Sequence, residues 1–221
     1  MKGDYRSTYL RKICAQNREL FDSPHVWFFS EDDLPLDPRR RFSGLKHTYL
    51  EFGFGHGEVL EELAQRHNDT GFVGIERRST RVKKALKRLH RIEAANVQLI
   101  RINLELIGEP LFVPGSFDQI LINHPDPWPR RRHEHHRFFR PDALEWIADL
   151  LTPQGSVEVA SDHADYFFTI LRLFGEDPRF ESLLPPPFYT AHAIPGRSVS
   201  LFEKRKRGAG QAVRILRYQR K

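Results

Sequence analysis

The chain has 221 residues, of which 39% are hydrophobic and 12% aromatic, which is enough apolar surface for one packed domain and excludes a disordered chain. Its apolar runs are short and its first residues include no apolar targeting segment, so we expect neither a membrane span nor a signal peptide. The one cysteine, Cys14, cannot form an internal disulfide, which favours a reducing, cytoplasmic location.

The net charge of +6 conceals an uneven distribution of charged residues. Segments 77–91, 130–140 and 197–221 together hold 22 lysines and arginines but only two acidic residues, whereas the rest of the chain is acidic overall. This separation predicts a face for a polyanion, and nucleic acid is the commonest polyanion. The alternative is three solvated faces that are not neighbours in space.

Residues 1–47 contain three of the prolines, Pro24, Pro35 and Pro38, together with a cluster of arginines. Because proline interrupts regular structure, we interpret this segment as an N-terminal extension with little helix or strand. The main domain is then expected to cover residues 48–221.

From residue 48 onward, short β-rich runs alternate with amphipathic helical patterns. Strands are predicted over 48–52, 71–76, 97–102, 117–122 and 156–160, and helices after residue 57 and over 77–92, 141–151 and 166–174. The alternation is typical of a doubly wound α/β fold with a parallel sheet. Two further β-rich runs, 198–202 and 213–218, predict an antiparallel hairpin that closes the sheet.

A glycine-rich loop lies where the first predicted strand ends and a helix begins. Gly53, Gly55 and Gly57 allow backbone amides to approach a ligand closely, although the same cluster also suits a plain tight turn. A dinucleotide site requires a further glycine at the position of Glu58. The pattern therefore argues against NAD.

Two carboxylates accompany this loop: Glu51 within the first strand and Glu76 at the end of the second. Glu76 can accept from a ribose diol, and Glu51 favours a cationic ligand over a pyrophosphate. S-adenosylmethionine, with its ammonium and sulfonium groups, fits this charge pattern. Asn103, after the third strand, can contact an adenine edge. The alternatives are a backbone cap for Glu51, an arginine partner for Glu76 and a helix N-cap for Asn103.

The loop that follows the fourth strand, over residues 123–132, reads N-H-P-D-P-W-P-R-R-R. Prolines on both sides of Asp126 restrict the backbone, so its carboxylate is held in place. In this fold class the loop lies beside the reactive end of a cofactor. A surface turn without function is the alternative.

Four features together resemble the bacterial tRNA (guanine-N7)-methyltransferases, the TrmB family: the glycine loop with Glu51, the P-D-P-W sequence before arginines, Ser161-Asp162, and Phe202-Glu203. The resemblance runs from about residue 50 to the C-terminus, and P-D-P-W is its most specific element. It implies a Rossmann-like class I methyltransferase with a mostly parallel seven-stranded sheet. It also implies methyl transfer from S-adenosylmethionine to N7 of guanine 46 in the variable loop of tRNA.

The resemblance also assigns roles to individual residues. Contacts to S-adenosylmethionine are expected from Glu51, Gly53, Gly55, Gly57, Glu76, Asn103 and Asp126. Asp126 is also the catalytic candidate. Contacts to tRNA and its guanine are expected from Arg130, Asp162, Ser200, Leu201, Phe202 and Glu203.

Several positions depart from the family pattern. Asn103 stands where aspartate is common, and Leu201 replaces a frequent lysine, whereas Ser200 keeps the hydroxyl of the usual threonine. His163 stands for tryptophan, and His124 for an aromatic or aliphatic residue. These departures bear more on RNA contacts and substrate identity than on the use of the cofactor.

Guanine N7 has an exposed lone pair at neutral pH, so its methylation requires positioning and charge stabilisation rather than a strong base. We expect Asp126 and Asp162 to accept from the N–H groups of the base. The arginines over 130–140, interleaved with Trp128, Phe138 and Phe139, are expected to grip RNA, although ordinary packing of the aromatics is the alternative.

Other functions stay open at this point. A related enzyme would methylate another RNA, a small molecule or a protein, and a non-catalytic RNA-binding module would keep only the fold. The histidine cluster over 133–136 is too tightly spaced for one ion to take every imidazole, so we expect no metal. Both a monomer and a homodimer are compatible with the sequence.

Overall fold

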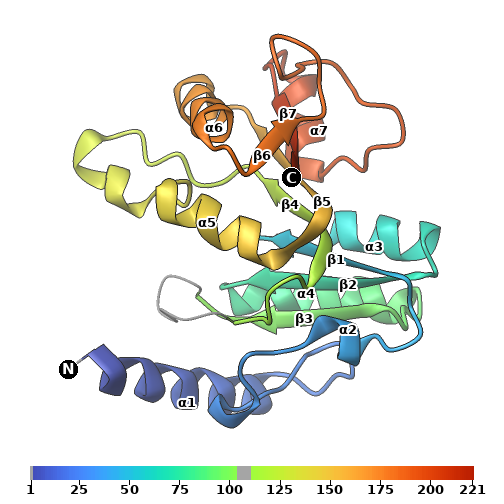
Figure 1. The fold of residues 1–221 in the computed structure, drawn as a ribbon. Coiled ribbons are helices and arrows are strands. Elements are labelled where there is room, and N and C mark those ends of the chain that lie inside the picture. The colour runs from blue at the N-terminus through green and yellow to red at the C-terminus, as the bar shows by residue number, and fades with distance from the viewer. Residues whose placement is uncertain (1, 104–110) are drawn as a thin grey trace. The chain divides into compact units, whose positions relative to one another are not determined.

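The computed structural model describes residues 2–103 and 111–221. The chain divides into two units, Met1–Ser116 and Phe117–Lys221, and each is described by itself. Figure 1 labels the helices and strands.

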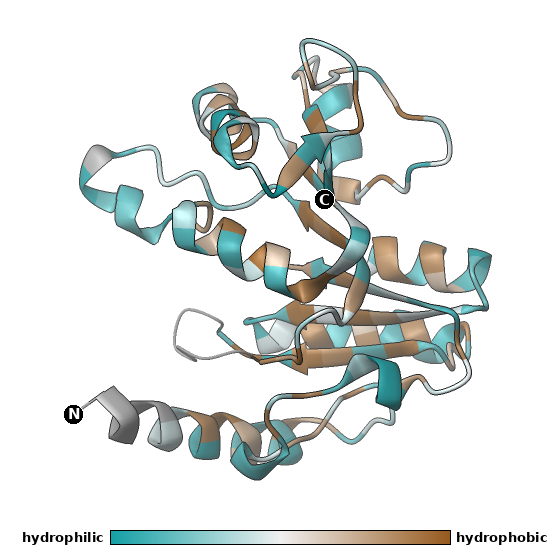
Figure 2. Cartoon of the chain, in the orientation of Figure 1, coloured by the Kyte–Doolittle hydropathy of each residue, from teal (hydrophilic) through white to brown (hydrophobic). Residues whose placement is uncertain are grey.

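The first unit contains three parallel strands in the order β3-β2-β1. Its elements are α1 (Lys2–Leu20), the 3-10 helix η1 (Glu31–Asp33), α2 (Pro38–Arg41), β1 (His47–Phe52), α3 (Glu58–Arg66), β2 (Thr70–Glu76), α4 (Ser79–Arg91) and β3 (Val97–Arg101). The strand interiors are inaccessible to solvent, as at Leu50, Val73 and Leu99, and Figure 2 shows these strands largely in brown. Near-continuous apolar runs of this kind are typical of parallel strands.

Helix α4 confirms the amphipathic pattern read from the sequence. Val82, Ala85 and Leu89 recur at three- and four-residue intervals, and all three are inaccessible to solvent. One face of the helix is therefore apolar along its length, while lysines and arginines occupy most of the other positions.

The expectation of little regular structure before residue 48 is wrong. α1 is a helix of 19 residues, and its buried side chains Leu10, Ile13 and Asn17 recur at helical spacing. No proline interrupts α1, because the prolines of this region lie after residue 23. The end of α1 is attached to β3, since Asn17 Nδ2 donates to the carbonyl oxygen of Arg101 at 3.0 Å. The domain boundary at residue 47 stays a prediction.

The second unit contains four strands in the order β4-β5-β7-β6, of which β4 and β5 are parallel. Its elements are β4 (Phe117–Asn123), the 3-10 helix η3 (Arg131–His136), α5 (Pro141–Leu150), β5 (Leu151–Ser161), α6 (Ala164–Glu176), β6 (Phe180–Ser182), α7 (Leu201–Gly208) and β7 (Arg214–Arg220). The two units thus contain the seven strands of the expected fold, mostly parallel with an antiparallel C-terminal pair.

The hairpin predicted from residues 198–202 and 213–218 is only half right. β7 is antiparallel as expected, but its neighbours are β5 and β6. The other arm is a helix, α7, whose first turn is capped by Ser200: the Ser200 hydroxyl accepts from the backbone N–H of Glu203 at 3.1 Å. Serine followed three residues later by glutamate is a helix-start signal that the short apolar run concealed.

Candidate functional site

The loop between β1 and α3 has open space beside its backbone. Gly53 and Gly55 have φ of 67° and 61°, and a Cβ added to either would meet no heavy atom closer than 4.0 Å. Gly57, with φ of 79°, differs because an added Cβ would lie 2.6 Å from the Cβ of Ala85. Gly57 therefore permits close packing against α4, whereas Gly53 and Gly55 leave a cradle beside the chain.

Two buried carboxylates lie near the carboxyl ends of neighbouring strands. Glu51 on β1 and Glu76 at the end of β2 expose only 2% and 3% of their surface. Glu76 accepts from the backbone N–H of Arg78 at 2.9 Å and from the guanidinium of Arg81 at 3.1 Å. The arginine partner that the sequence left as the alternative is therefore present. A carboxylate offers about four lone-pair sites, so Glu76 retains capacity for ribose hydroxyls.

These residues fit the predicted methyl donor. Buried carboxylates favour a cationic ligand and disfavour a pyrophosphate, because charges interact more strongly away from water. Glu51, Glu76 and the cradle at Gly53 and Gly55 would hold S-adenosylmethionine, which supplies an electrophilic methyl group when bound.

Asn103, which follows β3, lies against α1. Its backbone N–H donates to the hydroxyl oxygen of Tyr9 at 2.8 Å. Burial raises the pKa of Tyr9, although the hydrogen bond from Asn103 and the charge of Arg101 act in the opposite direction. Tyr9 was missed by sequence reasoning because α1 was not predicted. Residues 104–110 lie outside the described residues, and the contact of Asn103 with adenine stays a prediction.

In the second unit, the loop after β4 is constrained by its own backbone bonds. His124 and Trp128 have φ of 50° and 40°, which is uncommon for residues with a Cβ. The N–H of His124 donates to a carbonyl of β5, and Arg137 Nε donates to the carbonyl of Pro127 at 2.8 Å. Asp126 lies exposed within this constrained loop, and its role in the chemistry stays a prediction.

The arginines and aromatics of 130–140 do not form the uniform RNA-facing set that was expected. Arg137 holds loop carbonyls and lies 5.1 Å from the ring centroid of Tyr166, whose pKa burial raises to about 12. Phe139 is buried, so it packs in the core, and Trp128 packs against His136. Arg130 itself is exposed, and its role in substrate binding stays a prediction.

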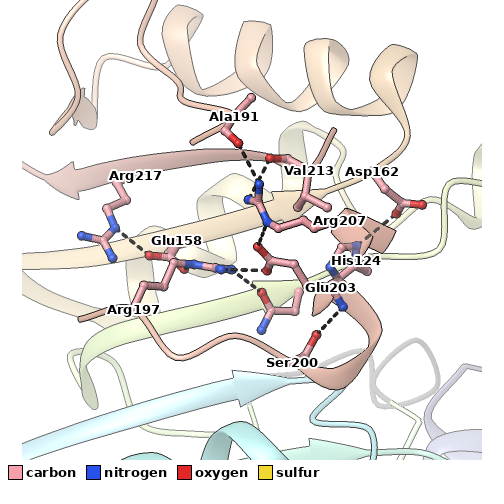
Figure 3. Close-up of polar contacts among 11 residues, drawn as sticks. His124, Glu158, Asp162, Ala191, Arg197, Ser200, Glu203, Arg207, Val213 and Arg217 are labelled. Atoms are coloured by element: carbon pink, nitrogen blue, oxygen red, sulfur yellow. Dashed lines mark hydrogen bonds and ion pairs between the residues drawn. The ribbon is translucent and has the colours of Figure 1, made fainter. Parts of the chain in front are cut away.

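Asp162, at the end of β5, has a partner for each carboxylate oxygen. Oδ1 lies 3.0 Å from Nδ1 of His124 (Figure 3), and Oδ2 lies 2.8 Å from Nζ of Lys206. Burial opposes ionisation of Asp162, but hydrogen bonds from Lys206 and His124 outweigh it and lower its pKa. Burial also lowers the pKa of His124. The neutral imidazole then donates from Nδ1 to the carboxylate.

The first turn of α7 presents apolar side chains beside this cluster. Leu201 and Phe202 expose 50% and 38% of their surface. The ring of Phe202 lies 4.6 Å from the ring of His124, edge to face, and 5.2 Å from Nζ of Lys206. Phe202, His124, Lys206 and Asp162 are therefore brought together, whereas the predicted contact at Ser200 is used as a helix cap.

Glu203 has a different place from the one expected of a substrate contact. It is inaccessible to solvent, and its oxygens lie 2.7 Å from Arg197 and 2.8 Å from Arg207. Arg197 also binds Glu158 on β5 (Figure 3). Its guanidinium donates as well to the side-chain oxygen of Asn123 at the end of β4. Glu203 is therefore linked through Arg197 to the end of β4, where the loop begins. Its burial argues against direct contact with the substrate.

The separated charges of the sequence are partly neutralised inside each unit. Three arginines of α4 pair with Glu61 or Glu76. Three arginines of segment 197–221 pair with Glu158 or Glu203. A part of the expected polyanion-facing charge is thus structural.

Within residues 2–103 and 111–221, no group of three His, Cys, Asp or Glu side chains is arranged to hold a metal ion. None of the helices in these ranges is long and apolar enough to cross a bilayer.

A protein-family model described as "Putative methyltransferase" matches residues 46–215. The chain is similar to curated enzymes named tRNA (guanine-N(7)-)-methyltransferase. It is 32% identical to that of Leptospira interrogans serovar copenhageni over 84% of this chain and 88% of the relative, and 30% identical to that of Nitrosomonas europaea over 84% and 82%. It is 36% identical to the Thermotoga maritima enzyme over 66% of this chain but spans only 47% of that relative.

Solved structures share the fold. The aminoglycoside resistance methyltransferase NpmB1 matches with a TM-score of 0.60 at 18% identity, over 88% of this chain and 95% of that chain. A 30S ribosomal A1408 methyltransferase from an uncultured bacterium matches with a TM-score of 0.53 at 15% identity, over 82% and 91%. The fold is that of the S-adenosylmethionine-dependent methyltransferases, and from the extent of the sequence matches the chain belongs to the tRNA (guanine-N7)-methyltransferase family.

Proposed function

We propose that this protein transfers a methyl group from S-adenosylmethionine to N7 of a guanine in tRNA. The observation that carries the proposal is the match to the Leptospira interrogans enzyme along most of both chains. The first unit supports it with two buried carboxylates and an open glycine cradle, which suit a cationic donor.

Two carboxylates of this chain have roles that match the reaction. Guanine N7 bears a lone pair and no proton, so no general base is required. Asp126 is exposed on a constrained loop and offsets the positive charge that the base acquires. Asp162, kept ionised by Lys206 and His124, accepts from the N–H groups of the guanine.

We assign the target, more finely, to guanine 46 of the variable loop, and we place the enzyme in the cytoplasm. The first assignment rests on the family resemblance, and the second on the single cysteine and on a tRNA substrate. For the oligomeric state, monomer and homodimer are both compatible with the proposal, because the residues named above come from one chain.

Purified protein, labelled S-adenosylmethionine and bulk tRNA, followed by nucleoside analysis, test the proposal. The expected product is 7-methylguanosine; a different methylated nucleoside, or none, contradicts it. Two matched tRNA transcripts, one with guanine and one with adenine at position 46, test the finer assignment. We expect label only in the first, and equal label in both excludes position 46.

A further inference from the structure

Helix α7 has two neighbouring rows of side chains with different partners. Glu203 and Arg207, four residues apart, lie 2.8 Å from each other, and Glu203 also lies 2.7 Å from Arg197 (Figure 3). These buried contacts attach the helix to the rest of the unit. Phe202 and Lys206 are also four residues apart, so they share another face of the helix. Nζ of Lys206 lies 5.2 Å from the centroid of the Phe202 ring.

Lys206 is the cation that accompanies Asp162. Its Nζ lies 2.8 Å from Oδ2 of Asp162, which is its one ion-pair partner within residues 2–103 and 111–221. An ammonium has three N–H donors, so Lys206 keeps donors for a ligand. The side chains of Lys206 and Asp162 expose 26% and 21% of their surface, whereas Glu203 exposes none. The pair of Lys206 and Asp162 is therefore open to a ligand in a way that the buried pairs of Glu203 are not.

A guanine is not identified by N7 alone. Guanine and adenine both have an acceptor at N7, and they differ at the neighbouring position, where guanine has the acceptor O6 and adenine has the N6 amino donor. An enzyme that methylates N7 of guanine therefore needs a donor that meets O6. A cation suits this position because it attracts O6 and opposes an amino group.

The pair of Asp162 and Lys206 matches the edge of guanine. Under the proposed function, Asp162 accepts from the N1–H of the base, and O6 is bonded to the carbon next to N1. A carboxylate beside an ammonium presents an acceptor beside a donor, which complements N1–H beside O6. The other cation-forming partner of Asp162 is His124, but its Nδ1 already lies 3.0 Å from Oδ1. Lys206 is left as the donor for O6.

We propose that Lys206 donates a hydrogen bond to O6 of the target guanine and thereby selects guanine over adenine. The proposal rests on the proposed function, since it takes a guanine as the substrate base. It adds a specificity-determining residue to Asp162, the residue expected to contact the same base.

The test is Lys206→Met, which keeps an apolar stem beside Phe202 and removes the ammonium. Its kcat/KM is measured on two tRNA transcripts that differ in one atom: the methylated position holds guanine or 6-thioguanine, whose sulfur is a weak acceptor. On guanine we expect kcat/KM to fall about tenfold from wild type. On 6-thioguanine the contact is already lost, so the variant should stay within about twofold of wild type. Nucleoside analysis counts only the N7 product.

The comparison carries its own correction for reactivity, because any effect of sulfur on N7 is the same for both enzymes and cancels in the ratio. The matched control is Lys204→Met, which removes an exposed lysine from the same helix. We expect this control to keep the wild-type preference for guanine over 6-thioguanine. Lys206→Arg retains a cationic donor and should keep most of that preference. Thermal melting checks that each variant folds.

Three outcomes overturn the proposal. Equal losses on both transcripts would mean that Lys206 acts on a phosphate or on Asp162 and not on O6. Near-normal activity of Lys206→Met on guanine would exclude the contact. Equal kcat/KM of the wild type on guanine and 6-thioguanine would exclude it without any variant. A wild-type protein that forms no 7-methylguanosine would instead end the proposed function, so the two failures are distinguishable.

Discussion

Cations serve two purposes in this chain, and one set of cations from each unit illustrates the contrast. In the second, Arg197 and Arg207 lie against Glu203, which is inaccessible to solvent, so their charges stabilise buried carboxylates. In the first, Lys12 and Arg78 line a pocket and have no ion-pair partner within the described residues. A count of lysines and arginines treats both sets alike. A cation that is paired with a buried carboxylate is structural, whereas a cation without such a partner is available to a ligand.

The sharpest test of this difference is Arg197→Met in the second unit. Arg197 exposes 3% of its side chain and contacts Glu158, Glu203 and Asn123. Removing one partner of a buried ion pair leaves uncompensated charge, so we expect the free energy of unfolding to fall by about 3–5 kcal/mol. Arg172→Met, at an exposed pair with Glu176, should change it by less than about 1 kcal/mol. Similar losses for both in urea denaturation would remove the distinction.

Asp126→Asn probes the loop that the buried network supports. The charge of Asp126 is expected to act on the developing cation, so turnover should fall on the order of 100-fold, while affinity for S-adenosylhomocysteine stays within about twofold. Asp149→Asn, an equally exposed change on α5, is the control and should leave both unchanged. Near-normal turnover by the Asp126 variant would remove this carboxylate from the reaction.

The parts of the fold that could be predicted are those with a strong local period. Strands β1 to β5 and α4 have continuous apolar runs or a regular apolar stripe, and they lie close to where expected, whereas β6 was not predicted and one predicted strand is α7. α1 was missed because one of its buried positions is the polar Asn17, which is buried by bonding to Arg101, 84 residues away. A local sequence pattern carries no information about a contact between residues so far apart in the chain.

In the candidate site, too, the placement of some residues followed from the sequence and that of others did not. Glu51 and Glu76 lie on β1 and β2, at the places predicted for them, whereas their burial was not predicted. The burial of Glu203 could not be predicted, because the Ser–x–x–Glu spacing is both a family motif and a helix cap and because its partner Arg197 becomes buried only in the folded unit. Burial of a charged pair depends on packing that the sequence does not display.

Glu76→Gln tests whether this carboxylate of the first unit contributes to binding of the methyl donor. Hydrogen bonds to a charged group contribute more than neutral ones, so loss of the charge should weaken S-adenosylmethionine binding about tenfold. Glu62→Gln, on α3 at a more exposed pair with Arg66, serves as the matched control and should bind as wild type does. Equal affinities in calorimetry for the wild type and the Glu76 variant would argue that this carboxylate serves Arg81 alone.

The smallest expected effect concerns His124 and pH. Burial lowers the pKa of His124 from its ordinary value of 6.5, so the unfolded chain binds this proton more readily. The free energy of unfolding should therefore decrease as pH falls below that value, and His124→Phe should reduce this decrease. His192→Phe removes an exposed imidazole and should keep the wild-type profile. Identical profiles for wild type and the His124 variant, measured by thermal melts, would contradict the assignment.

Calorimetric titration of the wild-type protein with S-adenosylmethionine, and separately with NAD, tests the central claim most directly. Buried carboxylates beside an open glycine cradle predict saturable binding of the sulfonium compound and no measurable binding of the dinucleotide. Binding of NAD but not of S-adenosylmethionine would contradict this claim.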